Sequence, residues 1–372
     1  MADYIRLSFC IIVFLASLLA VFKAPLYLLW KLAVGVTEFP HIPIFFSLTA
    51  FFSRYFVHNY IIQGDILSLG AAFICSYPVL SAYGTAKRTK KLLNIESSEF
   101  SFRFLKLFIG YGNKKIIPQT FIYKTFQDKE LKLDFYRSVS EKASPCVIVV
   151  HGGSWSSGDN KQLPQLNPHL AGKGYHVAAI NYRLAPKYNC PAPIEDVFDA
   201  LNYLKSNAAK LNIDTANFVL IGRSAGGQIS LLTAYSKQIP ELKGVISFYA
   251  PADMVWGWSL PGNPLVLDSR KVMKDFVGDT CENAPDKFAA SSPIEFVSEN
   301  SPPTLLIHGD NECMVAYEHS VRLSAKLKNK NVEHYLVTLP WGTHGCDFNL
   351  SGPTGQISTY AVEVFLKKTC KR

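Results

Sequence analysis

From residue 118 onward, short apolar runs alternate with amphipathic stretches, and this alternation limits the folds open to the chain more than any other feature. The continuous or alternating runs are 120–126, 131–136, 146–150, 176–182, 217–221, 245–248, 304–307 and 334–339. Apolar residues follow helical spacing over 193–206, 225–235, 318–327 and 356–368. Strands that alternate with helices form a mostly parallel sheet covered on both faces. The sequence therefore predicts an α/β fold.

The strongest single motif is G-R-S-A-G at residues 222–226, which directly follows one predicted strand and directly precedes a predicted helix. A sharp strand-to-helix turn holds the central residue in a strained conformation and lifts its hydroxyl out of the sheet. The residues two positions away must be small, and Gly222 and Gly226 meet that need. The motif therefore indicates that Ser224 is a catalytic nucleophile, against the alternative of a chance Gly-Ser turn.

A second glycine-rich turn, H-G-G-S-W at residues 151–155, follows the predicted strand 146–150. Acyl transfer passes through a tetrahedral oxyanion, and each preorganised N–H donor stabilises it by roughly 3–4 kcal/mol. We expect the amides of Gly152, Gly153 and Ala225 to form this oxyanion hole. The alternative is a plain turn after a strand.

A serine hydroxyl needs a base, and the base needs an acid that orients it. Of the nine histidines, His344 lies in a loop after the last predicted strand, where a base can reach the C-terminal edge of the sheet. We expect the acid in the turn after the strand 304–307, where Asp310 and Glu312 are both candidates. Charge alone does not separate these two.

Together, the stretches HGGSW, GRSAGG, HGDNECMV and THG resemble α/β-hydrolase-fold carboxylesterases and lipases. They are most similar to the hormone-sensitive-lipase-like and bacterial feruloyl-esterase-like branch, as are NYRLAP at 181–186 and PAPIEDVFDAL at 191–201. The resemblance implies the α/β-hydrolase fold and the chain order Ser, acid, His. It favours Glu312 over Asp310, because the family acid stands four residues after the histidine of the H-G turn. Two departures are a Glu where the family usually has Asp, and an oxyanion loop without a third glycine, as in formamidase and prenylcysteine-methylesterase relatives.

The resemblance implies a serine carboxylic-ester hydrolase with the triad Ser224, Glu312 and His344. It implies no cofactor, and no metal-ligand spacing is present. An amidase, formamidase or peptidase on the same triad is one alternative, and a non-catalytic membrane scaffold is another. The basic excess is local rather than spread over the folded domain, which argues against nucleic acid as a partner. The expected partners are a small-molecule or lipid ester and a membrane, and the oligomeric state is not predicted.

Three apolar runs, 7–22, 39–53 and 66–84, precede the catalytic part. A membrane-spanning helix needs about 20 apolar residues. The third run meets this length, the first meets it if it extends to residue 30 past Lys23, and the second is weaker because Pro40 and Pro43 open it. We therefore expect two or three transmembrane helices within residues 1–84. A cleaved signal peptide is the alternative for the first run.

Residues 86–116 carry eight Lys or Arg side chains against two Glu, so 85–117 is expected to be a basic juxtamembrane or interfacial linker. Its segment 100–109 is expected to lie on the membrane surface or on the catalytic domain, and a buried connecting helix is the alternative. With three spans, Lys23 and Lys31 fall on the same side of the membrane as the basic residues at 87–91, and Arg54 falls on the other. The positive-inside rule then predicts a multi-pass protein whose catalytic domain is cytoplasmic.

The catalytic domain is expected to cover residues 118–372 and to contain a long insertion at 251–303. So long an insertion between two strands favours a cap or a substrate wall over a plain loop. Met254, Trp256 and Trp258 either line an apolar acyl pocket or pack inside the insertion.

Overall fold

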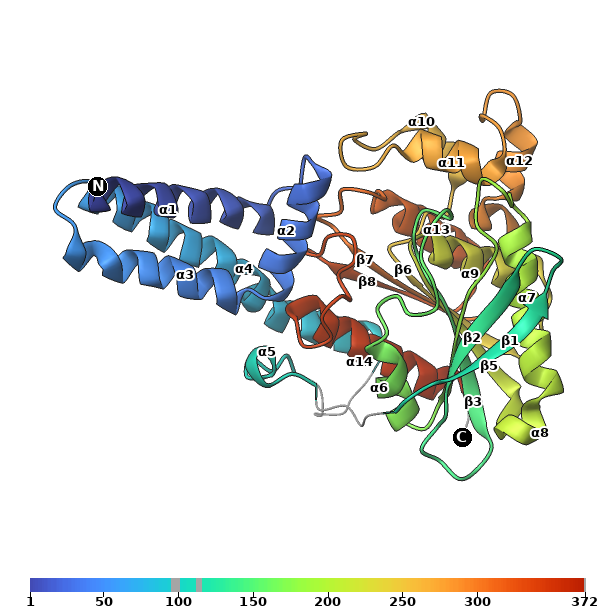
Figure 1. Ribbon diagram of the computed structural model, residues 1–372. Coiled ribbons are helices and arrows are strands. Elements are labelled where there is room, and N and C mark those ends of the chain that lie inside the picture. The colour runs from blue at the N-terminus through green and yellow to red at the C-terminus, as the bar shows by residue number, and fades with distance from the viewer. Residues whose placement is uncertain (95–100, 112–115, 371–372) are drawn as a thin grey trace.

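An eight-stranded sheet forms the centre of the C-terminal part (Figure 1). This computed structural model describes residues 1–94, 101–111 and 116–370. The strands follow the order β1-β2-β4-β3-β5-β6-β7-β8, in which β2 runs antiparallel to its neighbours and the remaining pairs are parallel. The strands are β1 (Gln119–Thr125), β2 (Glu130–Tyr136), β3 (Ser144–Val150), β4 (His176–Ile180), β5 (Ile213–Arg223), β6 (Leu242–Phe248), β7 (Thr304–Gly309) and β8 (His334–Leu339). The predicted α/β-hydrolase fold is confirmed.

Helices cover both faces of the sheet because side chains alternate along each buried strand. Ile148 points into one core, which contains apolar residues of α7 (Ala192–Ser206), α9 (Ala225–Ser236) and α13 (Glu318–Asn329). Val147 and Val149 point into the other core, which α6 (Leu166–Gly172) and α14 (Pro353–Thr369) cover. The short helix α8 (Ala208–Leu211) precedes β5.

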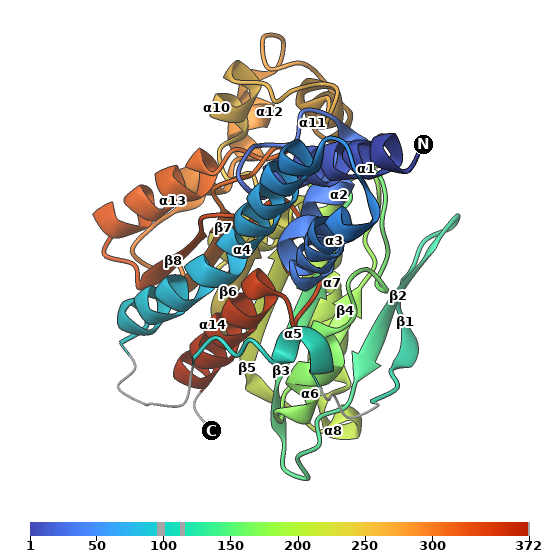
Figure 2. The same ribbon diagram turned by 90° about the vertical axis from the view of Figure 1, so that its left-hand side faces the viewer.

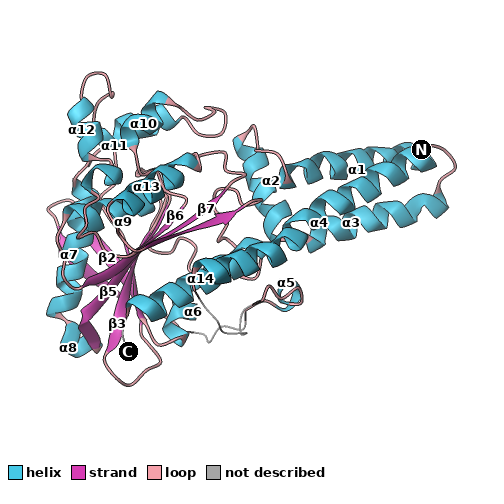
Figure 3. Ribbon diagram, turned by 180° about the vertical axis from the view of Figure 1, so that it is seen from behind, coloured by secondary structure: helices cyan, strands magenta, loops and turns pink. Residues whose placement is uncertain are grey.

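The N-terminal helices form a bundle that projects from one end of the catalytic part (Figures 1 and 3). The bundle consists of α1 (Ala2–Ser17) with η1 (Leu18–Ala20), α3 (His41–Phe52) with η2 (Ser53–Phe56), and α4 (Ile61–Leu92). Helix α2 (Tyr27–Glu38) is bent by 87° against the helix that comes after it, and lies across the end of the bundle nearest the sheet. By length and composition, two helices can cross a membrane, or three if the bent pair forms one span.

The first apolar run does not extend as a helix to residue 30. The helix ends at Ala20, and the chain turns through Lys23, Ala24 and Pro25 before α2 begins. The conditional extension past Lys23 is therefore not found, but Ala2–Ala20 is by itself long and apolar enough to cross a membrane.

The far end of the bundle is tied together by polar contacts. Asp3 accepts hydrogen bonds from the backbone N–H groups of His58 and Asn59, so the N-terminus and the turn before α4 lie at the same end. Nearby, the buried Arg6 lies 2.6 Å from Asp65, which also pairs with Arg54 at 2.8 Å. Buried charges require such partners.

The C-terminal half of α4 continues past the bundle and packs against α14, where Ala82 and Ala86 join the second core. The segment 101–109, with α5 (Lys106–Ile109), buries Phe102 and Leu107 in the same core and leaves Leu105 exposed. It therefore packs on the catalytic part with one side only. Residues 95–100 and 112–115 of the predicted linker lie outside the described residues.

The insertion at 251–303 folds over the C-terminal ends of the strands as α10 (Met254–Ser259), α11 (Ser269–Val277), α12 (Pro285–Ala290) and η3 (Pro293–Phe296) (Figure 2). Met254 is fully buried in the first core, and the Trp258 indole donates to Glu282 at 2.7 Å. Trp256 stacks edge-on against His319. None of Met254, Trp256 and Trp258 lines either of the two cavities described at Ser224, so of the two alternatives for these residues the structure favours packing over an acyl pocket.

Candidate active site

Ser224 occupies a strained turn between β5 and α9. Its φ of 51° and ψ of −121° lie in a region that L-residues rarely adopt. A Cβ at Gly222 would lie 2.1 Å from the backbone oxygen of Gly226, and one at Gly226 would lie 2.2 Å from that of His151. Both glycines are therefore required for the turn to close.

The structure brings three of the predicted residues together in a hydrogen-bonded chain. His344 Nε2 lies 2.9 Å from Ser224 Oγ, and His344 Nδ1 lies 3.0 Å from Glu312 Oε2. The exposed Asp310 takes no part in this chain, although its backbone N–H donates to the backbone oxygen of Leu339 at the end of β8. Of the two candidate acids, Glu312 is the one that contacts His344.

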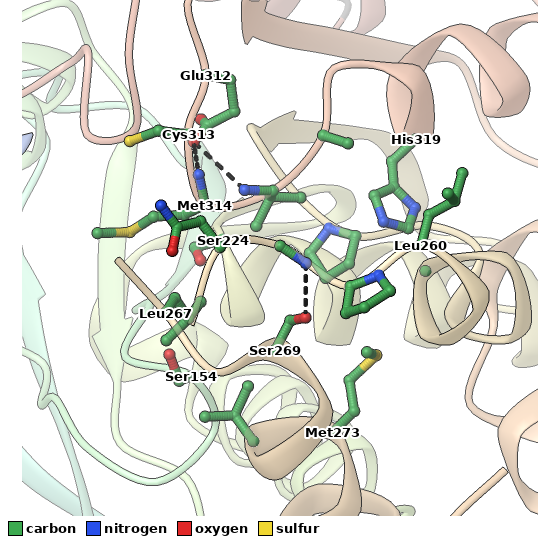
Figure 4. Close-up of a pocket in the computed structure, with 18 of the residues that line it drawn as sticks. Ser154, Ser224, Leu260, Leu267, Ser269, Met273, Glu312, Cys313, Met314 and His319 are labelled. Atoms are coloured by element: carbon green, nitrogen blue, oxygen red, sulfur yellow. Dashed lines mark hydrogen bonds between the residues drawn. The ribbon is translucent and has the colours of Figure 1, made fainter. Parts of the chain in front are cut away.

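Glu312 is fully enclosed and has further donors. Its Oε1 accepts the backbone N–H groups of Met314 at 2.7 Å and Val315 at 3.3 Å (Figure 4). Burial raises the pKa of the Glu312 carboxyl, but the charge of His344, the hydrogen bond from His344 and the nearby His308 outweigh burial. The net effect is a pKa below the usual value, so Glu312 stays a carboxylate at neutral pH.

The oxyanion turn differs from the prediction at one residue. The N–H of Gly152 donates to Oε1 of Gln162 at 2.7 Å, so that amide already has a partner inside the turn. The chain then passes through positive φ at Gly153 (116°) and Ser154 (52°). Gly153, Ser154 and Ala225 each line a cavity with Ser224, so their amides are the candidates for the oxyanion hole, whereas the Gly152 amide is occupied by Gln162.

A buried ion pair behind the triad was missed by the sequence analysis. The Arg223 guanidinium pairs with Asp347, which also accepts the hydroxyl of Tyr249. The Tyr249 ring lies 4.5 Å from the His344 ring. The ion pair between Arg223 and Asp347 joins the strand before Ser224 to the loop that carries His344. The sequence offered one sign of this ion pair, because Arg223 is a charged residue at the end of an otherwise apolar strand.

The N-terminal helices also contact the loops that carry His344 and Glu312. Trp30 of α2 donates its indole N–H to the backbone oxygen of His344 at 2.8 Å. Asn311, next to Glu312, donates its side-chain amide to the backbone oxygens of Leu19 and Phe22, each at 3.4 Å. The partners are about 300 residues apart in sequence, so no local pattern could have indicated them.

Two cavities meet at Ser224. The first, of about 460 Å³, lies under the insertion, and we name it the cap cavity (Figure 4). The second, of about 630 Å³, lies between α2 and the His344 loop, and we name it the α2 cavity. Within the described residues, no three His, Cys, Asp or Glu side chains come together as a metal site.

Comparison with known proteins agrees with this geometry. The sequence profile of the BD-FAE family matches residues 133–327. "Esterase LipC" of Mycobacterium tuberculosis is 30% identical over 258 residues, covering 63% of this chain and 62% of LipC. "Probable carboxylic ester hydrolase LipM" of the same organism is 27% identical over 242 residues, covering 60% of this chain and 54% of LipM. The chain thus spans less than two thirds of the length of these relatives.

Solved structures share the fold at low sequence identity. An esterase of Pyrobaculum calidifontis superposes with a TM-score of 0.59 and 20% identity, covering 79% of this chain and 94% of the esterase. A "truncated form of carbohydrate esterase from gut microbiota" gives a TM-score of 0.56 and 22% identity, covering 69% of this chain and all of that one.

Proposed function

The chain belongs to the BD-FAE family of α/β-hydrolase-fold carboxylesterases, and from this premise we propose that it is a membrane-anchored serine hydrolase that cleaves apolar or lipid-like carboxylic esters. The observation that carries the proposal is the hydrogen-bonded chain from Ser224 through His344 to Glu312, at 2.9 and 3.0 Å.

The proposed reaction has two halves. Ser224 Oγ attacks the ester carbonyl carbon while His344 Nε2 takes the hydroxyl proton, and Glu312 stabilises the imidazolium that forms. The oxyanion accepts hydrogen bonds from the amides of Gly153, Ser154 and Ala225. The carbon–oxygen bond to the alcohol then breaks as His344 returns the proton to the leaving oxygen. Water, deprotonated by His344, releases the acid from Ser224 in the second half.

Membrane anchoring is supported by the two long apolar helices, Ala2–Ala20 and Ile61–Leu92. Lys23, which lines the cap cavity, lies at the end of the bundle nearest the sheet. Asp3 and the turn before α4 lie at the opposite end. The positive-inside rule places the more basic end of the bundle in the cytoplasm. That end is the one nearest the sheet, so the catalytic part is cytoplasmic as well. A reporter fused to the C-terminus tests this orientation, and a signal only outside the cell would contradict it.

The decisive test is covalent labelling of the full-length protein in detergent with a fluorophosphonate probe, and then mapping of the labelled residue. We expect the label on Ser224 and its loss in Ser224→Ala. Ser154→Ala is the matched control, because it keeps the backbone amide that the mechanism uses and should keep the label. Absence of labelling, or labelling of another residue, would refute the enzyme assignment.

Paired turnover of p-nitrophenyl acetate and p-nitroacetanilide separates the ester hydrolase from the amidase alternative. We expect the ester to be cleaved much faster. Equal or faster cleavage of the anilide would favour the amidase.

A further inference from the structure

The two cavities share a short wall at the nucleophile and then diverge. Both are lined by Ser154, Ser224, Leu267 and Met314. An ester bound with its carbonyl carbon at Ser224 Oγ has two substituents, the acyl chain and the alcohol. Two cavities that meet at the serine can therefore hold one substituent each.

The position of His344 decides which substituent goes where. The leaving alcohol oxygen must accept its proton from His344 Nε2, so the alcohol begins on the side of that ring. His344 and Gly345 line the α2 cavity, whereas the cap cavity is lined instead by Ala225 and Trp155. The alcohol substituent accordingly leads into the α2 cavity and the acyl substituent into the cap cavity.

The walls of the α2 cavity indicate the chemistry of that alcohol. Side chains that line it include Trp30, Val34, Phe39, Leu163 and Phe348. Among the described residues that line it, only Lys31 carries a permanent charge. An apolar wall suits a hydrocarbon chain, and the lone lysine disfavours a cationic alcohol.

The location of α2 connects this cavity to the bilayer. Helix α2 lies across the end of the bundle (Figure 3). Its Leu28 and Leu32 are 73% and 44% exposed, while Val34 and Gly35 line the cavity. With α1 and α4 spanning the membrane, a helix in this position lies in the interface, and its outer apolar residues contact lipid.

We propose that the α2 cavity is the binding site for the long-chain alcohol of a lipid ester drawn from the membrane, and that the cap cavity holds the acyl group. This assignment rests on the proposed function and adds the identity of each substituent. Helix α2 is then a specificity-determining wall that the membrane region contributes to the catalytic part.

Gly35 allows a direct test. A Cβ at Gly35 meets no atom within 4 Å, and Gly35 lines the α2 cavity, so we expect the ring in Gly35→Phe to extend into the cavity. Gly84 of α4 is the matched control, because a Cβ there also meets nothing within 4 Å and Gly84 lies on an exposed surface.

The full-length protein in mixed micelles is assayed with two series of esters. One series lengthens the alcohol, from ethyl acetate to hexadecyl acetate, and the other lengthens the acyl chain of p-nitrophenyl esters. We expect Gly35→Phe to lower kcat/KM for hexadecyl acetate by about tenfold or more, and to change ethyl acetate and every p-nitrophenyl ester by less than about twofold. Gly84→Phe should change neither series.

Three results would overturn the inference. Loss confined to the long-acyl p-nitrophenyl esters would show that the two substituents are exchanged. Equal loss for all esters would show that position 35 acts on the triad and not on the chain. No loss for hexadecyl acetate would show that the alcohol lies elsewhere. A wild-type protein that cleaves none of the esters, or fails to label at Ser224, would refute the proposed function itself.

Discussion

Replacing Glu312 by glutamine keeps the size of the side chain and removes its charge, and the surrounding hydrogen bonds determine how the new amide is oriented. Met314 and Val315 both donate backbone N–H groups to Oε1. In Glu312→Gln the amide oxygen must therefore take the Oε1 position. The amide NH₂ is left facing His344 Nδ1, where Oε2 now lies at 3.0 Å.

This geometry forces the wrong tautomer on the base. Because the glutamine NH₂ donates to Nδ1, that nitrogen must be unprotonated, and the imidazole proton moves to Nε2. Nε2 then faces the hydroxyl of Ser224 as a donor and cannot accept its proton. The equivalent change in serine proteases lowers kcat by about 10⁴-fold, or about 5.5 kcal/mol of transition-state stabilisation. We expect a loss of similar size in kcat for p-nitrophenyl acetate.

Asp310→Asn is the matched control, because Asp310 is exposed and two residues away in the same turn. It should change kcat by less than about twofold. Melting temperatures measured alongside separate catalysis from folding, since about 1 kcal/mol of lost stability lowers Tm by about 2–4 °C in a chain of this size range. A Glu312→Gln variant that keeps more than about a tenth of wild-type kcat, or a large loss in Asp310→Asn alone, would refute the reasoning.

Three further predictions concern stability and are measured by thermal unfolding of the full-length protein in detergent. Asp347→Asn leaves the Arg223 guanidinium buried without its counter-charge and should cost about 3–5 kcal/mol, whereas the double variant Arg223→Met/Asp347→Leu should cost much less; equal losses would contradict this. Gly226→Ala brings a Cβ to 2.2 Å from a backbone oxygen and should abolish labelling as well as lower Tm, so a fully active variant would show that the turn is not tight. Burial lowers the pKa of His308 to about 4 and of His319 to about 3, from 6.5. Since the unfolded chain binds more protons below 6.5, each histidine should remove about 2 kcal/mol of stability at pH 5, and a Tm that is flat from pH 7 to 5 would be inconsistent with both.

The sheet and the nucleophile were predictable because they depend on local pattern. A strand buried on both faces must be apolar throughout, as at 146–150, and a turn that clashes with any Cβ must carry glycines, as at Gly222 and Gly226. The chain order of Ser224, Glu312 and His344 also matches the order of the strands. The strand and the turn are set by residues that are neighbours in sequence, whereas the chain order came from the family resemblance.

The errors concern contacts between distant residues. Whether the Gly152 amide is free depends on Gln162, and the choice between the two readings of Trp258 depends on its contact with Glu282. Hydropathy locates the first apolar run but not the end of its helix, which lies at Ala20. Apolar content alone therefore does not distinguish a spanning segment from α2, which lies across the bundle.

The N-terminal helices contact the loops of two residues of the proposed triad. The loop of His344 receives a hydrogen bond from Trp30, and Asn349 in the same loop donates to the backbone of Glu38. The turn that carries Glu312 is joined to the end of the first helix through Asn311. The loops of the acid and the base are thus both fixed by residues 19–38, while Ser224 is fixed by the sheet. Proton transfer needs all three groups at hydrogen-bonding distance. The positions of the base and the acid therefore depend on the position of residues 19–38 against the two loops. In the proposed orientation, the same helix that steadies His344 also lines the path of the alcohol, so substrate bound along α2 and the geometry of proton transfer are coupled through one structural element.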